Sequence, residues 1–302
     1  MRKTLLETIL DSKKLTVLFQ PIFRIQNGVD VYALEALVRG PAGTNVESAS
    51  ILFDYVRRKK AEAAVDRSCL SAICRAVLNV PANLPINVNV HAWTLGRECE
   101  FVDFFFKKLR SYNLAPERFT LEIVEHAPNC NVPDLSDSIA RLRDRGVSIA
   151  LDDVGLGQSN YRMMLDCDPD YFKLDAYFAR NLKTDSRRRA VVRSVVSLAD
   201  AMDTLVVAEG IDSKDDLDEV RRAGIELVQA NILCPAMRPE DLVAGLQAPD
   251  AAPDELSAHD VNHSRLRKAS VLMAVQSQGA SVGIGGPRLV SAPAPTLIRA
   301  GD

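Results

Sequence analysis

Short apolar runs alternate with helical patterns through most of this chain, and this alternation limits the folds it can adopt. Eight such runs lie at residues 17–23, 31–39, 86–90, 119–125, 149–153, 171–175, 205–210 and 227–232. Helical patterns lie at residues 4–14, 48–59, 61–78, 97–110, 133–145, 185–202 and 213–223. Strands that alternate with helices predict parallel β-α-β units. Eight units over roughly 230 residues favour a (β/α)8 TIM-like barrel of the α/β class. A doubly wound dinucleotide fold is disfavoured, because no glycine-rich phosphate loop follows the first strand.

Composition excludes several classes of partner. The 302 residues carry a net charge of -3, with a pI near 5.9, so no overall basic field would attract DNA, RNA or an anionic membrane. No apolar segment reaches the length of about 18 residues that a membrane span needs. Glu7 comes too early for the core of a signal peptide. The six cysteines show no Cys-x-x-Cys spacing, which predicts reduced thiols and a cytoplasmic location.

The composition changes near residue 247. Alanine, proline, serine, glycine and aspartate dominate the remaining segment, in which a short helix could form only within residues 263–276. Such a composition buries too little apolar surface to fold by itself. We therefore expect one barrel domain over residues 4–247 and a disordered or weakly helical tail over 248–302.

Two adjacent carboxylates, Asp152 and Asp153, end the fifth apolar run, and Gly155 and Gly157 follow. Neighbouring side chains on a strand point to opposite faces, so both can serve one site only if the strand ends there and the chain turns. Glycine permits that turn. Paired carboxylates repel each other unless a cation lies between them, which favours a divalent metal. The alternative for this segment alone is an exposed acidic turn.

Polar residues lie at or near the carboxyl ends of most predicted strands, where barrels of this type carry their active sites. The residues are Glu35, Asn89, Glu122, Asp152, Asp153, Lys173, Glu209 and Gln229. Burying so many carboxylates unpaired would be costly, and metal coordination removes most of that cost. A donor set made only of oxygen favours Mg²⁺ or Mn²⁺, and paired hard ions are typical of phosphoester hydrolysis. Lys173 and Arg39 supply positive charge for phosphate oxygens or for the attacking water.

The same residues carry a resemblance to a known family. The ordered motifs are Glu35-Ala36-Leu37 with Arg39, Asn89, Leu121-Glu122-Ile123-Val124-Glu125, Asp152-Asp153-x-Gly155-x-Gly157, Lys173-Leu174-Asp175, Val207-Ala208-Glu209-Gly210 and Gln229. Their combination resembles the EAL-domain family of cyclic di-GMP phosphodiesterases over roughly residues 4–245. The resemblance implies an EAL-type modified barrel, commonly a homodimer. It also implies a two-metal hydrolase that opens cyclic di-GMP to linear pGpG with Mg²⁺ or Mn²⁺, and so lowers the level of a bacterial second messenger in signal transduction.

The resemblance also implies residue roles. One metal would be bound by Glu35, Asn89, Glu122 and Asp152. The second would be surrounded by Asp152, Asp153 and Glu209. The catalytic residues would be Glu209, acting as a base through water, Lys173, orienting the nucleophilic water, and Glu35. The substrate side would be lined by Gln20, Arg39, Gln229 and Asp175, and Glu125 would anchor the loop after the aspartates.

Several positions depart from the family pattern, and none of them is a metal ligand. They are Val154, Leu156, Gln158, Ala230 and Asn231, where common members carry Phe, Thr, Tyr, Gly and Tyr. The departures leave open a second hypothesis: a non-catalytic cyclic di-GMP receptor or a protein-interaction module on the same scaffold. Individual residues also have ordinary alternatives, namely an edge-strand charge for Glu35, a surface ion pair for Lys173 with Asp175, and structural roles for His91 and His126.

Overall fold

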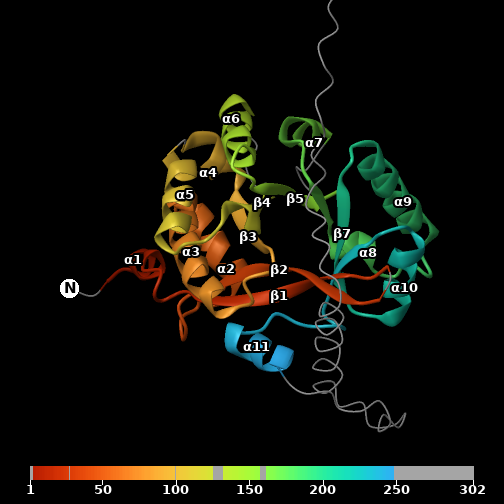
Figure 1. Ribbon diagram of the computed structural model, residues 1–302, viewed down its shortest axis with the longest axis horizontal. Helices are drawn as coiled ribbons and strands as arrows, with labels where there is room; N and C mark the ends of the chain where they lie inside the picture. Colours follow the sequence, from red (N-terminus) through yellow and green to blue (C-terminus); the bar gives the residue numbers. More distant parts are fainter. Residues whose placement is uncertain (1–2, 27, 99, 125–131, 157–160, 248–302) are drawn as a thin grey trace, which may run out of the picture.

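Eight strands close a barrel in this computed structural model, which describes residues 3–26, 28–98, 100–124, 132–156 and 161–247 (Figure 1). The strands follow chain order around the barrel: β1 (Thr16–Arg24), β2 (Asp30–Arg39), β3 (Ile86–His91), β4 (Phe119–Val124), β5 (Ser148–Val154), β6 (Tyr171–Leu174), β7 (Leu205–Ile211) and β8 (Leu227–Ala230). Each of the eight apolar runs forms one of these strands, so the predicted barrel is confirmed.

The first strand differs from the simple parallel pattern. β1 runs antiparallel to both β2 and β8. The strands from β2 to β8 all run parallel to one another. Only residues 25–29 connect β1 to β2, and a parallel crossover needs a dozen residues or more. A hairpin is therefore the only connection this length allows. Its register pairs Gln20 with Glu35 and Thr16 with Arg39, so the beginning of β1 lies beside the carboxyl end of β2.

Helices surround the barrel (Figure 1). The predicted ones are α1 (Leu5–Leu10), α2 (Ala49–Arg58), α3 (Glu62–Ala76), α5 (Glu100–Ser111), α6 (Val132–Arg143), α9 (Ser186–Ala201) and α10 (Lys214–Arg222). Four more were not expected from periodicity: α4 (Ala92–Arg97), α7 (Tyr161–Cys167), α8 (Ala176–Ala179) and α11 (Pro239–Gln247). Short 3-10 turns lie at Val77–Asn79 and Pro116–Arg118. Three of the unexpected helices span fewer than two full turns, too short to show a helical period.

Local sequence signals explain several helix starts. Thr4 and Glu7 form a capping box at α1, in which each side chain accepts a hydrogen bond from the other residue's backbone N–H. Asp185 caps α9 by accepting from the N–H groups of Arg187 and Arg188. Such caps satisfy backbone donors that have no partner within the helix.

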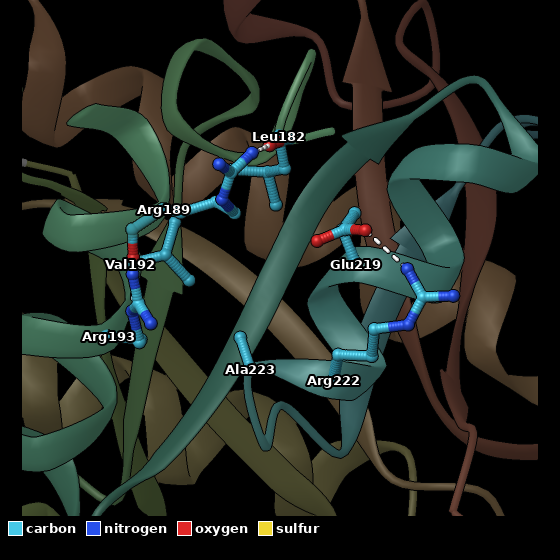
Figure 2. Close-up of a pocket in the computed structure, with 7 residues that line it drawn as sticks. All are labelled: Leu182, Arg189, Val192, Arg193, Glu219, Arg222 and Ala223. Carbon is cyan, nitrogen blue, oxygen red and sulfur yellow. Dashed lines mark hydrogen bonds and ion pairs between the residues drawn. The ribbon is translucent and has the colours of Figure 1, made fainter. Parts of the chain in front are cut away.

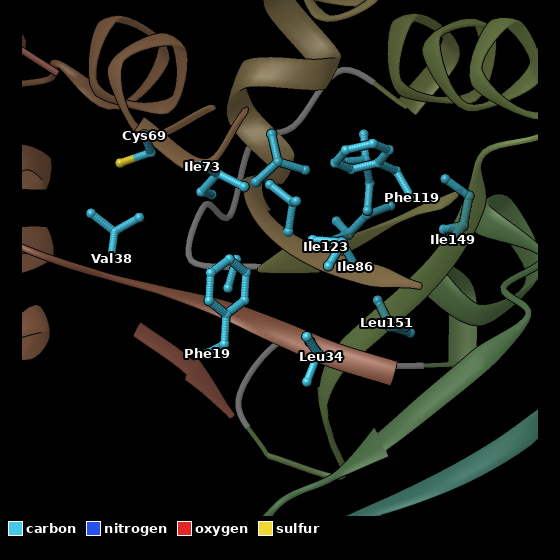
Figure 3. Packing of buried hydrophobic residues seen from close by; sticks show 14 of the residues in the cluster. Phe19, Leu34, Val38, Cys69, Ile73, Ile86, Phe119, Ile123, Ile149 and Leu151 are labelled. Carbon is cyan, nitrogen blue, oxygen red and sulfur yellow. The ribbon is translucent and has the colours of Figure 1, made fainter. Parts of the chain in front are cut away.

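Most of the hydrophobic core lies between the barrel and its helices. Figure 3 shows Phe19 of β1 and Val38 of β2 below Cys69 and Ile73 of α3, and all four belong to one cluster of buried residues. A second, smaller cluster contains Ile22, Ala33, Val207 and Leu227, with Tyr32, Tyr171 and Leu205 packed against it. The hydroxyls of Tyr32 and Tyr171 are hydrogen-bonded at 2.7 Å. Strand alternation places this second cluster inside the barrel.

Two further predictions can be compared with the described residues. Cys69, Cys74, Cys167 and Cys234 are free and buried, as the prediction of reduced thiols requires. None of the helices in the described ranges is long and apolar enough to cross a membrane.

Candidate active site

The candidate site lies one layer beyond the apolar cluster inside the barrel. Glu35 follows Ala33 by two residues, Glu209 follows Val207, and Gln229 follows Leu227. Residues two apart on a strand share a face, so these polar side chains point into the barrel toward its carboxyl end. The strand geometry thus gathers at one end of the barrel the polar groups that were singled out from the sequence.

Lys173 on β6 is the centre of this polar layer, and its side chain is only 2% exposed. Its Nζ lies 2.6 Å from Glu122 Oε2, 2.6 Å from Glu209 Oε1, 3.0 Å from Glu35 Oε2 and 3.7 Å from Asp152 Oδ1. The four carboxylates come from β2, β4, β5 and β7. Four strands therefore bring oxygen donors to a single positive charge, and the surface ion pair of Lys173 with Asp175 that the sequence left open is not what forms.

Amide side chains hold two of these carboxylates. Asn89 Nδ2 donates to Glu35 Oε1 at 2.8 Å, and Gln229 Nε2 donates to Glu35 Oε2 at 2.8 Å. Asn87 Nδ2 donates to Glu122 Oε1 at 2.7 Å. Asn87 was not among the predicted site residues, although its place on the same face of the strand as Asn89 was visible in the sequence. Its contact fixes the orientation of a fully buried carboxylate.

The electrostatics of Lys173 and Glu35 favour charged forms. Burial alone would lower the pKa of Lys173, but Glu122, Glu209, Glu35 and Asp152 outweigh it and raise that pKa well above its ordinary value. Burial alone would raise the pKa of Glu35, but the Lys173 charge and the donated hydrogen bonds lower it below the ordinary value. This pair is therefore ionised at neutral pH.

Three other acids, Glu122, Glu209 and Asp153, have pKa values above their ordinary ones. Burial, together with repulsion from Glu35, raises the pKa of Glu122 well above its ordinary value. Burial raises the pKa of Glu209 to about 8, although Lys173 opposes the shift. Burial and repulsion from Asp152 and Asp175 raise the pKa of Asp153 to about 6. A second positive charge near these acids would lower their pKa values and release protons.

Two bulges aim the acids of β5 and β7. The register of β5 against β6 shifts between Leu151 and Val154, and Asp153 adopts a φ of 52°. Aspartate is among the few residues that reach this left-handed region readily. The strand was expected to end at the aspartates, but it continues to Val154. The bulge, rather than the end of the strand, brings the two adjacent carboxylates toward one site.

The bulge in β7 depends on a glycine. The register of β7 against β8 shifts between Ala208 and Ile211, around Glu209 and Gly210. Gly210 has a φ of 60°, and a Cβ there would lie 2.6 Å from Ala176 Cβ. Only glycine satisfies both restrictions, which explains why it follows the catalytic candidate Glu209.

A chain of hydrogen bonds extends from Glu35 to the rim. Gln229 Nε2 also lies 3.0 Å from Gln20 Oε1, and Gln20 Nε2 donates to Asn231 Oδ1 at 3.0 Å. Asn231 Nδ2 donates to Asp212 Oδ1 at 3.1 Å. Of the predicted substrate-side residues, Gln229 is thus bonded directly to Glu35, and Gln20 is linked to it through Gln229. Asn231, a departure from the family pattern, holds the outer end of this chain.

The other predicted residues are placed as follows. Asp175 caps α8 by accepting from the backbone N–H of Tyr177 at 2.6 Å, and its charge also acts on Asp153. Glu125, His126, Gly157 and Gln158 lie outside the described residues.

His91 lies at the end of β3, where its Nδ1 is 2.8 Å from Asp66 Oδ1. Burial alone would lower the pKa of His91, but Asp66 outweighs it and raises that pKa.

A pocket of about 480 Å³ opens beside the acids. Glu35, Asn89 and Asp152 lie at its inner end, and Arg39 is also part of its wall. Burial lowers the pKa of Arg39 below its ordinary value, and the Glu35 charge opposes this shift. The guanidinium therefore lies within electrostatic range of Glu35. The volume falls within the range of small-molecule sites.

A smaller cavity of about 100 Å³ lies between α9 and α10 (Figure 2). Arginines dominate its wall, but they point to partners of their own. Arg189 donates to the carbonyl oxygen of Leu182, and Arg222 pairs with Glu219. None of the predicted site residues lines this cavity, so the pocket beside the acids is the better candidate for the active site.

The donor set can be compared with what a metal requires. No three His, Cys, Asp or Glu side chains in the described ranges already surround one point as metal ligands would. Carboxylate oxygens from four strands nevertheless converge on Lys173, and such hard oxygen donors match Mg²⁺ or Mn²⁺ in type. The residues therefore fit a hard divalent ion by their chemistry, with Lys173 as the cation that they surround in this structure.

Comparisons with known proteins give a family match and several relatives. The EAL domain family matches residues 2–236. Cyclic di-GMP phosphodiesterase NbdA of Pseudomonas aeruginosa is 29% identical over 231 residues, which cover 74% of this chain and 29% of NbdA. The chain thus spans less than a third of the length of that relative.

Two solved structures share the fold. The PaMucR phosphodiesterase in complex with c-di-GMP has a TM-score of 0.69 and 24% identity, over 78% of this chain and 97% of that one. Klebsiella pneumoniae BlrP1 in a calcium and cyclic di-GMP complex has a TM-score of 0.68 and 21% identity, over 79% of this chain and 59% of that one. At these identities the likeness supports the fold.

Proposed function

This chain belongs to the EAL domain family, and on that premise we propose that it is a metal-dependent phosphodiesterase that hydrolyses cyclic di-GMP to linear pGpG. One observation carries the proposal: carboxylates from four strands converge on Lys173 beside a pocket that also contains Arg39. Its support from relatives is that NbdA is named a cyclic di-GMP phosphodiesterase and that BlrP1 was solved with a divalent ion and cyclic di-GMP.

We infer that the two ions are Mg²⁺ or Mn²⁺ and that the acids hold them. One would be held by Glu35, Asn89, Glu122 and Asp152. The other would be held by Asp152, Asp153 and Glu209. Such ions, when bound, lower the pKa of water and stabilise the charge that develops on a phosphate. Hydrolysis adds water at one phosphorus atom of the ring and breaks its bond to the 3′ oxygen. The linear product pGpG then has a terminal 5′-phosphate and a free 3′-hydroxyl, which takes up a proton, and its other phosphodiester is intact.

The chain's own residues then bind, orient and move protons. Arg39 binds a phosphate oxygen through charge-assisted hydrogen bonds. Lys173 orients the attacking water, and Glu209 accepts its proton. Gln229 and Asn89 keep Glu35 in position through the hydrogen bonds described above. Each role requires only groups that lie within the polar layer or along the wall of the pocket.

The direct test is product analysis. The purified protein is incubated with cyclic di-GMP and Mg²⁺ or Mn²⁺, and the nucleotides are separated by liquid chromatography. We expect pGpG with either ion and none after chelation with EDTA. If pGpG forms with neither ion, the proposal that this chain is a phosphodiesterase is wrong. Tight nucleotide binding without turnover would instead select the receptor hypothesis, which the residues Val154, Leu156, Ala230 and Asn231 favour.

Metal affinity is expected to increase with pH. Glu209 has a pKa of about 8 in the ion-free site, so between pH 6 and 8 it must release a proton before its carboxylate can bind an ion. A raised carboxyl pKa weakens metal binding at low pH, because the proton competes with the ion. This competition disappears as the pH rises through 8. We expect up to about tenfold tighter Mn²⁺ binding per pH unit for each proton released. Calorimetry at pH 6, 7 and 8 measures this, and a pH-independent affinity would contradict it.

We also infer a homodimer and a cytoplasmic location. α7 supports the dimer because its Tyr161 and Leu165 are large apolar side chains that are each 75% exposed. Sedimentation velocity of the purified protein tests the dimer, and a purely monomeric sample at micromolar concentration would contradict it.

A further inference from the structure

The pocket beside the acids continues well past the reacting centre. Glu35 and Asp152 line it together with residues of α2, α3 and β3, and we call the part formed by α2 and the end of β3 its outer part. Phe53 and Arg57 of α2 and His91 of β3 line this outer part. None of these three residues was included in the predicted site. A phosphodiester bound at the acids would extend the rest of its structure into this space.

The outer part carries a second guanidinium. Arg57 pairs with Asp54 through a long contact of 3.4 Å between half-exposed side chains, which is a weak interaction in water. Arg57 lines the pocket together with His91, and its charge acts on that imidazole. Arg39 and Arg57 therefore present two positive groups along one pocket. A ligand with two phosphates matches this pattern.

Two rings, those of Phe53 and His91, pack in an edge arrangement in the outer part of the pocket. The rings of Phe53 and His91 lie 5.7 Å apart between centroids, at an interplanar angle of 60°. Asp66 fixes the imidazole, because it accepts from the His91 backbone N–H and lies 2.8 Å from Nδ1. Thr94 also donates to Asp66, so this carboxylate is fully engaged by the protein. Fixed rings offer a flat nucleobase a rigid apolar wall at low entropic cost.

We propose that Phe53, Arg57 and His91 form a subsite for the half of a cyclic dinucleotide that carries the second phosphate. Arg57 pairs with that phosphate, and the two rings contact the neighbouring base. The proposal rests on the proposed function, because it assumes that the first phosphate is bound at the acids. It makes Arg57 a specificity-determining residue: it distinguishes a substrate with two phosphates from a simple phosphodiester.

Two adjacent arginines provide a matched test. Arg57→Gln and Arg58→Gln are the same change in the last turn of α2, but only Arg57 lines the pocket. With cyclic di-GMP as substrate, we expect Arg57→Gln to raise KM about tenfold with kcat nearly unchanged, the loss expected for one charge-assisted contact. Arg58→Gln should leave both constants unchanged. Phe53→Leu, which keeps an apolar side chain but removes the ring, should raise KM by about threefold.

The outcomes separate the two proposals. Calorimetric binding of cyclic di-GMP to the unmodified protein and to both variants accompanies the kinetics. If the unmodified protein neither binds nor cleaves the nucleotide, both the function and the subsite are wrong. If it does either and Arg57→Gln behaves like Arg58→Gln, only the subsite is wrong. A large fall in kcat for Arg57→Gln would also overturn it, because a binding residue remote from the reacting atoms should act on KM.

Discussion

Replacing Lys173 with methionine is expected to lower the free energy of unfolding by about 3–5 kcal/mol, the usual cost of removing one partner from a buried ion pair. Methionine keeps the length of the side chain but leaves Glu35, Glu122 and Glu209 without the charge that they surround. Turnover should also fall by about a hundredfold or more, since Lys173 is proposed to orient the attacking water.

Urea denaturation at two pH values measures this effect. The unpaired carboxylates of Lys173→Met should take up protons, so the loss of stability should be larger at pH 8 than at pH 5. Lys183→Met is the matched control. Its pair with Asp215 is more than half exposed on both sides, so we expect a change below about 1 kcal/mol. Equal losses for the two variants would show that Lys173 is not the organising charge of the polar layer.

Replacing Glu35 with glutamine is expected to reduce turnover of cyclic di-GMP by roughly a hundredfold to a thousandfold, because preorganised charge at a reacting centre has an effect of this size. The change removes a charge but keeps the shape of the side chain. Lys173 retains Glu122 and Glu209 as partners, so the fold should survive. Affinity for Mn²⁺ should weaken in parallel, and calorimetry reports this without relying on activity.

Circular dichroism and product chromatography distinguish the outcomes for Glu35→Gln. A native spectrum with lost activity supports a catalytic or ligating role. Loss of the folded spectrum would instead assign Glu35 a structural role. Glu240→Gln, an equivalent change on the exposed surface of α11, should affect neither measurement. Turnover at the unmodified rate by Glu35→Gln would remove this residue from the reacting centre.

Much of the barrel could be predicted because strand patterns are strong in this chain. Each apolar run became a strand, and each long helical pattern became a helix. The antiparallel start was signalled by the short connection and its Asn27-Gly28 dipeptide, but the alternation rule alone assigned every strand to parallel units. Helices α4, α7 and α8 were missed because elements this short depend on tertiary contacts rather than on periodicity.

The site was predictable in composition and less so in detail. Barrel geometry forces residues at strand ends to meet, so Glu35, Glu122 and Lys173 could be grouped before any coordinates. The bulges at Asp153 and Gly210 could not, because a register shift is decided by the neighbouring strands. Asn87 lies on the same face of β3 as Asn89, but it stands outside the motifs that predicted the site. The outer part of the pocket could not be predicted, because it forms only where α2 and β3, which are distant in the sequence, come together in the fold.

The packed layer inside the barrel has a consequence for how a ligand reaches the polar site. Tyr32 and Tyr171 join beneath Ile22, Ala33 and Leu227, so the lower layer is filled by side chains. Within the described residues, this packed layer lies inside the barrel on the far side of Glu35 and Gln229 from the pocket that Arg39 lines. Under the proposed function, we therefore expect pGpG to leave on the side of the barrel by which cyclic di-GMP enters.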